Sequence, residues 1–529
     1  MQGAAASTDG AGLGGVYRRR EPETTALYRV LQQHLATFEQ QWTDPAEGRT
    51  LPRFVIDELR GFLDCGILAR GFAHLYCDGC GERHLVAFAC KGRGFCPACL
   101  GRRMTEGAAN LVDHVLPRVP LRQWVLTLPY PLRFPLAFDA ALLGAVLRLF
   151  LDTVAGWYRQ RQADRGLAGG QCGAVTVIQR GSSDLRLNPH FHAVFLDGVY
   201  LAGADGAAPL FHPAPAPTQE DVEAVVERAR RRILRLLVRR GIVTVIAAPG
   251  DGELDVRTDD GGIERDPLLA HLLAASAAGA PPAGPANKRA PVRLGVDPAA
   301  RPERRGRLVA QDCGFNLHAA TRVASNDDAG REALCRYILR PPIANAHLHR
   351  LPDGTVQITL KRPWSDGTTS IALAPLALIA RLAALVPPPR RHVTRYFGVL
   401  AAHSKLRPLV GPRPPPVPLP VADDERGPAD RSPRYIPWAE LLRRTFAIDL
   451  RCQRCGAQLR LIALVKTEGT IKKILASMGL PTEPPPPHPA RPPPTAQSLA
   501  HQQQHLPYCR HRTDGVPFPP ESLVPGPRS

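Results

Sequence analysis

Hydrophobic residues recur at helical or strand spacing in many separate stretches of this chain. Apolar residues that lie three or four positions apart predict helices within 24–42, 54–62, 142–157, 221–240 and 331–339. Shorter apolar runs beside glycine or proline predict strands at 125–128, 175–179 and 192–196, and a hairpin of 356–360 with 370–373. The ordered parts of the chain therefore combine helices with strands.

Proline- and glycine-rich segments separate these elements. Residues 249–310 are rich in Gly, Ala, Pro and Asp and are expected to form a loose insertion. Residues 411–433 contain eight prolines, which predicts a stiff linker, and the last 49 residues hold 15 of the 55 prolines, which predicts a disordered tail. One main core with two small attachments is therefore expected rather than several full domains.

The basic excess of the chain has two competing explanations. The sequence has 529 residues, with 67 Lys and Arg against 48 Asp and Glu, and a formal charge of +19. Such an excess favours a polyanionic partner such as nucleic acid. However, 60 of the 67 basic residues are Arg, as drift in a GC-rich genome would also produce. The longest apolar stretch, 371–386, is interrupted by Pro375 and Arg381, so no membrane span is predicted, and no secretory signal is visible.

Two close cysteine pairs near the N-terminus are typical of a zinc site. Cys77 and Cys80 are followed fifteen residues later by Cys96 and Cys99, which gives the pattern C-x2-C-x15-C-x2-C. Four thiolates at this spacing can enclose one tetrahedral Zn²⁺ in a closed structural site, and the ion would supply much of the folding energy of a small module. Twelve cysteines in 529 residues are too few for a disulfide framework.

Other cysteines allow more than one interpretation. Cys65 and Cys90 are interpreted as packing residues, with Cys90 as a competing zinc ligand. The pair Cys452–Cys455 forms one C-x2-C turn without an obvious second. A pair of structural thiols is the default interpretation, and a second zinc completed by His505 and Cys509 of the tail is the alternative.

Two histidines lie two residues apart in a predicted strand. Alternate residues of a strand project on the same side, so His190 and His192 face one side of the sheet while Phe191 faces the other layer. Two neighbouring imidazoles can hold a divalent cation that stabilises charge in phosphoryl transfer. Taken alone, however, such a pair more often marks two partly exposed histidines on an edge strand.

The order of several motifs makes the chain resemble the HUH endonucleases, which are named for a His-hydrophobic-His strand. Within that group it resembles the rolling-circle transposases of the insertion-sequence ninety-one type (IS91), in their single-tyrosine, ISCR-like branch. The resemblance covers roughly residues 50–480. Its motifs are CDGC at 77–80, FCPAC at 95–99, VLTLP at 125–129, VIQRG at 177–181, LNPHFH at 187–192, CRYILRPP at 335–342 and LRCQRC at 450–455.

The resemblance implies both a fold and a reaction. The fold is α+β, with an antiparallel HUH endonuclease core of the RRM/ferredoxin-like kind, an N-terminal zinc ribbon and a small C-terminal accessory segment. The reaction is metal-dependent cleavage and rejoining of single-stranded DNA at element ends through a 5′-phosphotyrosine, which drives rolling-circle transposition. His190 and His192 would hold Mg²⁺ or Mn²⁺, with Gln179 as the expected third ligand and Asp184 or Asp197 as competing candidates.

Tyr337 is the expected nucleophile. It lies on a short predicted helix between Arg336 and Arg340, just before a Pro-Pro stop. A free phenol titrates near pH 10, about three units above neutrality, so catalysis must activate the phosphate more than the hydroxyl. Two-tyrosine members of the family carry a second tyrosine four residues earlier, where this chain has Ala333, so a cycle with two nucleophiles is in doubt. Tyr396 could substitute, but a structural or DNA-contacting role is expected for it.

Clusters of arginine indicate that part of the basic excess contacts DNA phosphates. Residues 228–240 contain seven Arg, and Arg231 and Arg235 would lie on a basic helix face that tracks phosphates. Arg336, Arg340 and a second cluster within 390–407 are also expected to contact phosphates. All of these are expected to flank the metal and tyrosine site, and a solvated face produced by drift is the alternative.

The expected partners are single-stranded DNA at mobile-element ends and host DNA-unwinding machinery, because the sequence has no Walker-type G-x4-G-K-[ST] loop. No membrane and no small-molecule substrate are expected, and the expected location is the bacterial cytoplasm, in association with the nucleoid. The alternatives are a plasmid replication initiator or relaxase of the HUH class, and a catalytically inactive zinc-ribbon DNA-binding protein. The expected organisation is a tail and helix (1–50), a zinc ribbon (51–104), a catalytic domain (105–345) with its C-terminal part (346–410), the linker (411–433), an accessory segment (434–480) and the tail (481–529).

Overall fold

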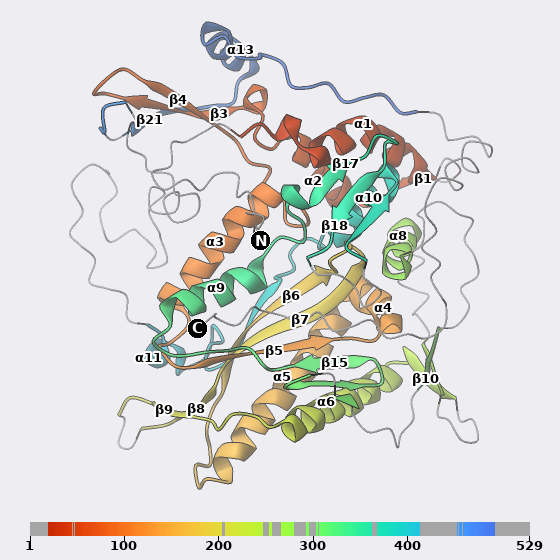
Figure 1. Cartoon of the computed structure of the whole chain (residues 1–529), viewed down its shortest axis with the longest axis vertical. Coiled ribbons are helices and arrows are strands. Elements are labelled where there is room, and N and C mark those ends of the chain that lie inside the picture. Colours follow the sequence, from red (N-terminus) through yellow and green to blue (C-terminus); the bar gives the residue numbers. More distant parts are fainter. Residues whose placement is uncertain are drawn as a thin grey trace, which may run out of the picture.

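An eight-stranded antiparallel sheet forms the centre of the structure, a computed structural model (Figure 1). The strands lie in the order β13 (Glu303–Arg304), β14 (Val309–Asp312), β15 (Phe315–His318), β5 (Leu121–Thr127), β7 (Leu187–Leu196), β6 (Gly173–Gly181) and β20 (Thr394–Gly398), and β16 (Arg322–Val323) also pairs with β5. The structure describes residues 20–44, 46, 48–203, 207–246, 253–256, 266–279, 292–295, 303–304, 306–361, 368–412, 452, 454–457 and 459–491. The long central strands β5, β7 and β6 carry most of the motifs.

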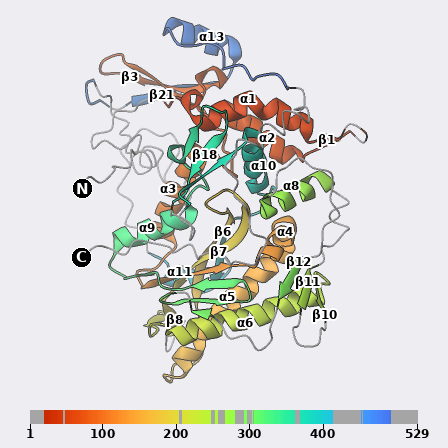
Figure 2. The same cartoon turned by 45° about the vertical axis from the view of Figure 1, so that its right-hand side comes forward.

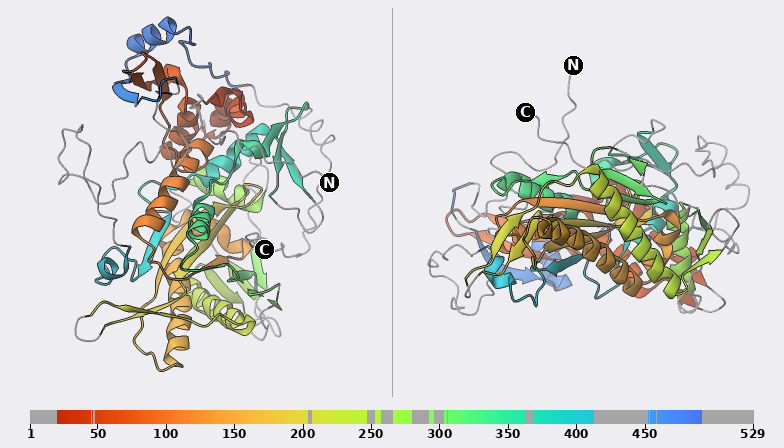
Figure 3. Two further views of the ribbon diagram at one scale, coloured as in Figure 1. Left: turned by 60° about the vertical axis from the view of Figure 1, so that its left-hand side comes forward. Right: turned by 90° about the horizontal axis from the view of Figure 1, so that it is seen from below.

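Helices cover both faces of this sheet. On one face α5 (Ala140–Ala163) and α6 (Gln219–Arg239) pack with α4 (Arg133–Phe138) against Phe191 and Phe195 of β7. On the other face α3 (Pro97–His114) and α9 (Asp328–Leu339) pack against Val194 and Leu196 of the same strand. Figure 3 shows these layers from two further sides. The alternation along β7 therefore sends its phenylalanines to one layer and leaves its two histidines on the face of α3 and α9.

A second apolar core lies beside the sheet. Helices α1 (Ala26–Gln41), α2 (Arg53–Asp64), α8 (Pro267–Ala278) and α10 (Pro375–Leu385) pack together with β17 (Leu348–Arg350) and β18 (Val356–Thr359), and β19 (Ser370–Leu373) pairs with β18. Figure 2 shows this cluster above the central sheet. Segments that lie far apart in the sequence, from α1 to α10, therefore build one core.

A small three-stranded sheet lies at the end of the molecule near α1 (Figures 1 and 2). Its order is β21 (Leu459–Val465), β3 (Phe72–Cys77) and β4 (Arg83–Ala87), and α13 (Glu468–Ser477) packs Ile471 and Leu475 on its apolar side. The segment that was expected to be a separate accessory unit thus supplies the third strand of the N-terminal module.

Short elements complete the described part of the chain. β1 (Thr43–Asp44) pairs with β2 (Arg49–Thr50), and β8 (Gly198–Leu201) pairs with β9 (Leu210–Pro213). β10 (Val243–Ile246), β11 (Glu253–Val256) and β12 (Val292–Gly295) form a three-stranded sheet, and α11 (Arg407–Val410) follows β20. Single 3-10 turns lie at Pro22–Thr24, Leu68–Arg70, Tyr130–Leu132 and Asn345–His347.

Most predicted elements are confirmed, with two corrections. The predicted helices correspond to α1, α2, α5, α6 and α9, and the mixed architecture with an antiparallel sheet is as expected. The expected loose insertion at 249–310 contains α8, whose Leu272 and Leu273 are buried in the second core. The tail was expected to be disordered, but the structure describes its first residues, 481–491. In this segment His488 N donates to Gln32 O of α1 at 3.0 Å. The Pro-rich linker lies largely outside the described residues, as do His505 and Cys509.

One helix, α5, is long and apolar enough to cross a membrane by length and composition alone. More than half of its most apolar stretch is buried inside the protein, where Val146, Phe150 and Val154 pack against the central sheet. A core helix passes the same test, and α5 has the position of one.

Candidate functional site

The two histidines of β7 lie side by side under the helices α3 and α9. Both side chains are buried, and their ring centroids are 4.9 Å apart. Within the sheet, His190 lies between Gln179 of β6 and Thr127 of β5, and His192 lies between Val177 and Val125. This placement excludes the alternative of two exposed histidines on an edge strand, because β7 is a central strand.

Hydrogen bonds fix one nitrogen of each imidazole. His190 Nδ1 lies 2.7 Å from Asn188 O, to which it donates, so Nε2 is the nitrogen that would carry the lone pair when the ring is neutral. His192 Nδ1 lies 2.8 Å from the amide nitrogen of Gln123. His192 Nε2 is buried and has no hydrogen-bond partner among the described residues. An imidazole that is fixed at Nδ1 and open at Nε2 is the arrangement that metal-binding histidines adopt.

Burial keeps His192 neutral. Loss of solvation lowers the pKa of His192 well below its ordinary value of 6.5, and the charges of His190, Arg340 and His318 lower it further. Burial also lowers the pKa of His318, which lies on the same face of the sheet two strands away. A neutral imidazole is the form that binds a metal ion.

Helix α9 places Tyr337 over this pair. The Tyr337 and His192 ring centroids are 5.7 Å apart, and Arg340 Cζ lies 4.5 Å from the centroid of the Tyr337 ring. The side chain of Asp327 caps the first turn of the helix by accepting from Gly330 N at 2.7 Å, and the helix ends at Leu339. The structure thus brings the predicted nucleophile, the predicted ligands and one predicted phosphate contact together from distant parts of the sequence.

Hydrogen bonds from two side chains anchor α9 near its ends. Arg331 is almost fully buried and donates to the carbonyl oxygens of Leu116, Pro117 and Val119 at 2.7–3.1 Å. At the other end, Gln179 Nε2 donates to Ile338 O at 2.9 Å. The tyrosine is therefore held between a buried arginine and the strand that carries the expected third ligand.

The two competing third ligands are occupied elsewhere. Asp184 pairs with Arg186 and Ser182 in the loop before β7, and its pKa is lowered despite burial because of those neighbours and Arg381. Asp197 lies at the far end of β7 and accepts from Arg122 and Tyr158, both at 2.9 Å. Among the described residues, no third His, Cys, Asp or Glu groups with His190 and His192 as ligands of one ion.

The predicted arginines divide into two groups. Arg340 lies at the tyrosine, and Arg336 on the same helix pairs with Glu332 at 2.7 Å. The expectation that Arg231 and Arg235 flank the same site is wrong, because α6 covers the opposite face of the sheet. There Arg231 pairs with Glu227, four residues earlier on the same helix.

Another arginine of that run has a structural role. Arg230 is buried and pairs with Asp312 of β14 at 2.6 Å. Tyr396, the possible second nucleophile, lies on the edge strand β20 with Arg407 over its ring at 5.1 Å. Ala333 is exposed on α9.

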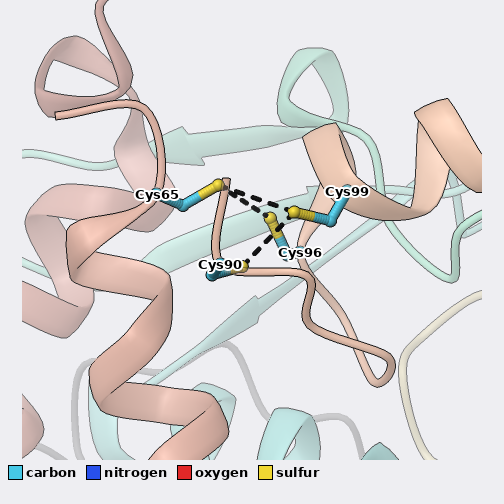
Figure 4. A group of neighbouring side chains, drawn as sticks. All are labelled: Cys65, Cys90, Cys96 and Cys99. Atoms are coloured by element: carbon cyan, nitrogen blue, oxygen red, sulfur yellow. Dashed lines mark hydrogen bonds between the residues drawn. The ribbon is translucent and has the colours of Figure 1, made fainter. Parts of the chain in front are cut away.

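The cysteines group differently from the sequence prediction. A single site built from Cys77, Cys80, Cys96 and Cys99 does not form, because the two C-x2-C pairs lie in different clusters. Cys96 and Cys99 at the start of α3 instead meet Cys65, at the end of α2, and Cys90, after β4 (Figure 4). The sulfur atoms of Cys65 and Cys99 are 3.7 Å apart, and those of Cys90 and Cys99 are 3.4 Å apart.

These separations fit a bound metal better than disulfides. A disulfide requires sulfur atoms about 2.05 Å apart. Four thiolates at about 2.3 Å from a tetrahedral Zn²⁺ are about 3.8 Å from one another. Cys65 and Cys90, which were interpreted as packing residues, therefore belong to a four-thiol cluster that could hold zinc.

The second cluster joins an early and a late segment of the sequence. It contains Cys77, Cys80, Cys452 and Cys455, with all four sulfur atoms within 4.8 Å of one another. Cys77 Sγ lies 3.3 Å from Cys455 Sγ, and Cys80 Sγ lies 3.4 Å from Cys452 Sγ. The late C-x2-C pair thus finds its partners in the first pair of the chain rather than in the tail.

A sequence signal for this grouping exists. Glycine follows the last cysteine of both pairs in the second cluster, as Gly81 and Gly456, whereas Leu100 follows Cys99. Gln123 and His318 were also missed, because their place beside His192 depends on strand pairing that local spacing does not reveal.

Two family models match the chain. One, described as "Transposase zinc-binding domain", matches residues 30–128, and one described as "Putative transposase" matches residues 173–407. The transposase for insertion sequence element IS801 of Pseudomonas savastanoi pv. phaseolicola is 25% identical over 378 residues, which are 70% of this chain and 75% of that protein. No solved structure matches the chain.

Proposed function

Because the chain belongs to the IS91-type transposases, we propose that it cuts and rejoins single-stranded DNA at the ends of a mobile element, with Tyr337 as the nucleophile. One observation carries the proposal. The Tyr337 ring lies over a buried pair of histidines on a central strand, with the guanidinium of Arg340 against the same ring. A core tyrosine with a purely structural role would not require that arrangement.

The proposed reaction exchanges one phosphate ester for another. The hydroxyl oxygen of Tyr337 bonds to the phosphorus, the bond to the 3′ oxygen breaks, and the phenolic proton is released while the 3′ oxygen takes up a proton. The number of ester bonds is conserved, so a 3′-OH can attack the phosphotyrosine in the reverse sense and rejoin DNA. Arg340 is positioned to bind the phosphate by paired N–H donors while Tyr337 attacks.

His190, His192 and Gln179 are the residues that would hold a divalent ion, and they fit it. Two imidazoles are adjacent, Nε2 of His192 is buried without a partner among the described residues, and Gln179 is the cross-strand neighbour of His190. Mg²⁺ or Mn²⁺, when bound, would polarise the phosphate and stabilise its developing charge. The third ligand can be the Gln179 side-chain oxygen, because its nitrogen is used by Ile338 O.

Gln123 acts as a positioning residue for His192. Its Oε1 atom is buried and has no hydrogen-bond partner among the described residues in the present amide orientation. Rotating the amide by 180° places Oε1 on Nδ1, where it accepts the Nδ1 proton and leaves the Nε2 lone pair for a metal ion. In this orientation the Oε1 atom of Gln123 gains a donor and Nε2 of His192 is left with its lone pair.

A covalent-adduct assay tests the proposal. The full chain is incubated with Mn²⁺ and a single-stranded oligonucleotide of a candidate element end that is labelled on its 3′ side. The labelled strand should become attached to protein on a denaturing gel. Tyr337→Phe and the double variant His190→Ala/His192→Ala should abolish the adduct, and Tyr396→Phe should keep it. An adduct that persists in Tyr337→Phe would show that another residue is the nucleophile.

The same assay separates the rival functions. Cutting of a plasmid origin in preference to an element end would favour a replication initiator or relaxase. DNA binding without any adduct would favour an inactive DNA-binding protein. We further propose that host machinery supplies the single strands, since the sequence has no Walker-type loop.

A further inference from the structure

The two C-x2-C-G turns of the second cluster have the same backbone geometry. In the first turn, Gly81 N donates to Cys77 O at 2.9 Å, and Cys77 N donates to Glu82 O at 2.9 Å. The second turn repeats both bonds at the equivalent positions, from Gly456 N to Cys452 O at 2.7 Å and from Cys452 N to Ala457 O at 2.6 Å. The main chain of each turn is therefore folded around its two thiols in the same way.

The glycines of these turns are required by geometry. Gly81 and Gly456 both have φ of +75°, which side chains other than glycine rarely allow. A side chain at Gly79 would come within 3.2 Å of Cys455 Sγ and 3.1 Å of Ala457 Cβ. The first turn thus leaves space at its tip for the second one.

The second turn is also docked by its flanking strand. β21 pairs with β3 in antiparallel register, with Leu459 opposite Cys77 and Val465 opposite Phe72. Arg460 makes two hydrogen bonds of 2.9 Å to the Asp78 carboxylate, which lies inside the first turn. These contacts align the two turns face to face.

We propose that Cys77, Cys80, Cys452 and Cys455 bind a second zinc ion, which fastens the C-terminal segment onto the N-terminal module. The sulfur separations of 3.3 and 3.4 Å between the turns are close to the edge of about 3.8 Å expected for a tetrahedral zinc-thiolate site. Four thiolates leave no open position, so the ion is structural. The zinc-binding family model ends at residue 128 and contains only half of this site.

The ion would connect two segments that are far apart in the sequence. Cys80 and Cys452 are 372 residues apart, and the whole central sheet lies between them in the sequence. Without the ion, β21 is held by its pairing with β3, by the Asp78–Arg460 ion pair at the surface and by α13. The zinc therefore joins the late segment with Cys452 and Cys455 to the early segment with Cys77 and Cys80.

Zinc content decides the proposal. The full chain, purified under reducing conditions, should contain two zinc ions per chain by elemental analysis, and X-ray absorption should show only sulfur ligands. Cys452→Ser/Cys455→Ser should contain one zinc, and the matched change Cys65→Ser/Cys90→Ser in the other cluster should also contain one. A single zinc that Cys452→Ser/Cys455→Ser retains, or two zinc ions that this variant retains, would overturn the proposal. Neither result requires an activity measurement.

Hydrogen exchange tests the fastening role in the same proteins. Backbone amides of 459–465 and 468–477 should exchange at least ten-fold faster in Cys452→Ser/Cys455→Ser than in the unchanged chain. Cys313→Ser, which alters a thiol outside both clusters, should leave them unchanged. Equal protection of these two segments in the double variant and the unchanged chain would show that the ion does not hold the segment in place.

Discussion

Replacing Gln123 by leucine tests whether the amide holds His192 for metal binding. Gln123 and His192 are both fully buried, and their side chains are joined by a hydrogen bond of 2.8 Å. Leucine is close to glutamine in size, so the change removes the hydrogen bond while it largely keeps the packing. His192 Nδ1 is then left buried without that partner.

The expected loss follows from the cost of that unpaired nitrogen. A buried polar group that loses its partner costs about 1–3 kcal/mol. If all of this appears in metal affinity, it corresponds to a loss of roughly 5- to 150-fold, and losses of about 10–100-fold are typical for such supporting residues. We therefore expect Mn²⁺ to bind Gln123→Leu about 10–100 times more weakly.

Two measurements and two controls check this prediction. Mn²⁺ binding is followed by the loss of the free-ion EPR signal, and adduct yield is followed as a function of Mn²⁺ concentration. Gln123→Glu keeps an acceptor for the Nδ1 proton and should remain much closer to the unchanged protein. Thr176→Val removes a buried hydroxyl, without a partner among the described residues, from the opposite face of β6, and should leave the Mn²⁺ dependence unchanged.

The reasoning would be refuted by equal Mn²⁺ affinity in Gln123→Leu and Thr176→Val. It would also fail if Gln123→Glu and Gln123→Leu lost affinity equally, because the accepting oxygen would then be irrelevant. A fall in urea stability without any change in Mn²⁺ affinity would assign Gln123 a purely structural role.

Three further changes test other parts of the molecule. Arg340→Ala should lower the adduct rate about 100-fold and Arg340→Lys should restore only part of it, because lysine cannot offer paired donors to a phosphate; an unaffected rate would exclude a phosphate contact. Asp197→Ala leaves the buried Arg122 guanidinium without its carboxylate and should cost about 3–5 kcal/mol in urea unfolding, whereas Asp328→Ala, which removes an exposed pair with Arg118, should cost less than about 1 kcal/mol. Burial, Arg491 and Arg350 lower the pKa of His34 to about 4, below the ordinary value of 6.5. The contribution of neutral His34 to the free energy of unfolding should therefore be fully present above pH 6.5 and should be lost as the pH drops toward 4. His34→Gln should lose less stability over this range in urea unfolding, and an equal loss in both proteins would contradict the prediction.

Local patterns predicted the elements well because their signals lie within single segments. The amphipathic repeat of α5, the alternation of β7 and the Asp-capped, proline-terminated helix α9 are all visible over fewer than thirty residues. The place of His190, His192 and Tyr337 in one site was expected from motif order rather than from spacing. The structure brings the three rings together, as that order implied.

Partner choice over long distances was not predictable in the same way. Cys96 and Cys99 fit the spacing of a single zinc site with Cys77 and Cys80, yet α3 begins at Pro97 and carries Cys99 toward the end of α2. The competing partners of the first turn lie more than 370 residues away, behind a Pro-rich linker. Spacing rules count residues along the chain, whereas a zinc site selects thiols by the shape of the folded module.

The roles of the many arginines were also not predictable from the sequence, because some arginines are buried and structural whereas others are available to phosphates. Arg122, Arg230 and Arg331 are almost fully buried, where they pair with Asp197 and Asp312 or cap backbone carbonyls. Such arginines are costly to remove, but they cannot contact DNA. A charge of +19 therefore overstates the surface available to phosphates, and the predicted arginine that lies against the Tyr337 ring is Arg340. Since Arg331 and Gln179 hydrogen-bond near the two ends of the same helix, the position of Tyr337 beneath Arg340 follows from contacts within the protein and does not depend on bound DNA.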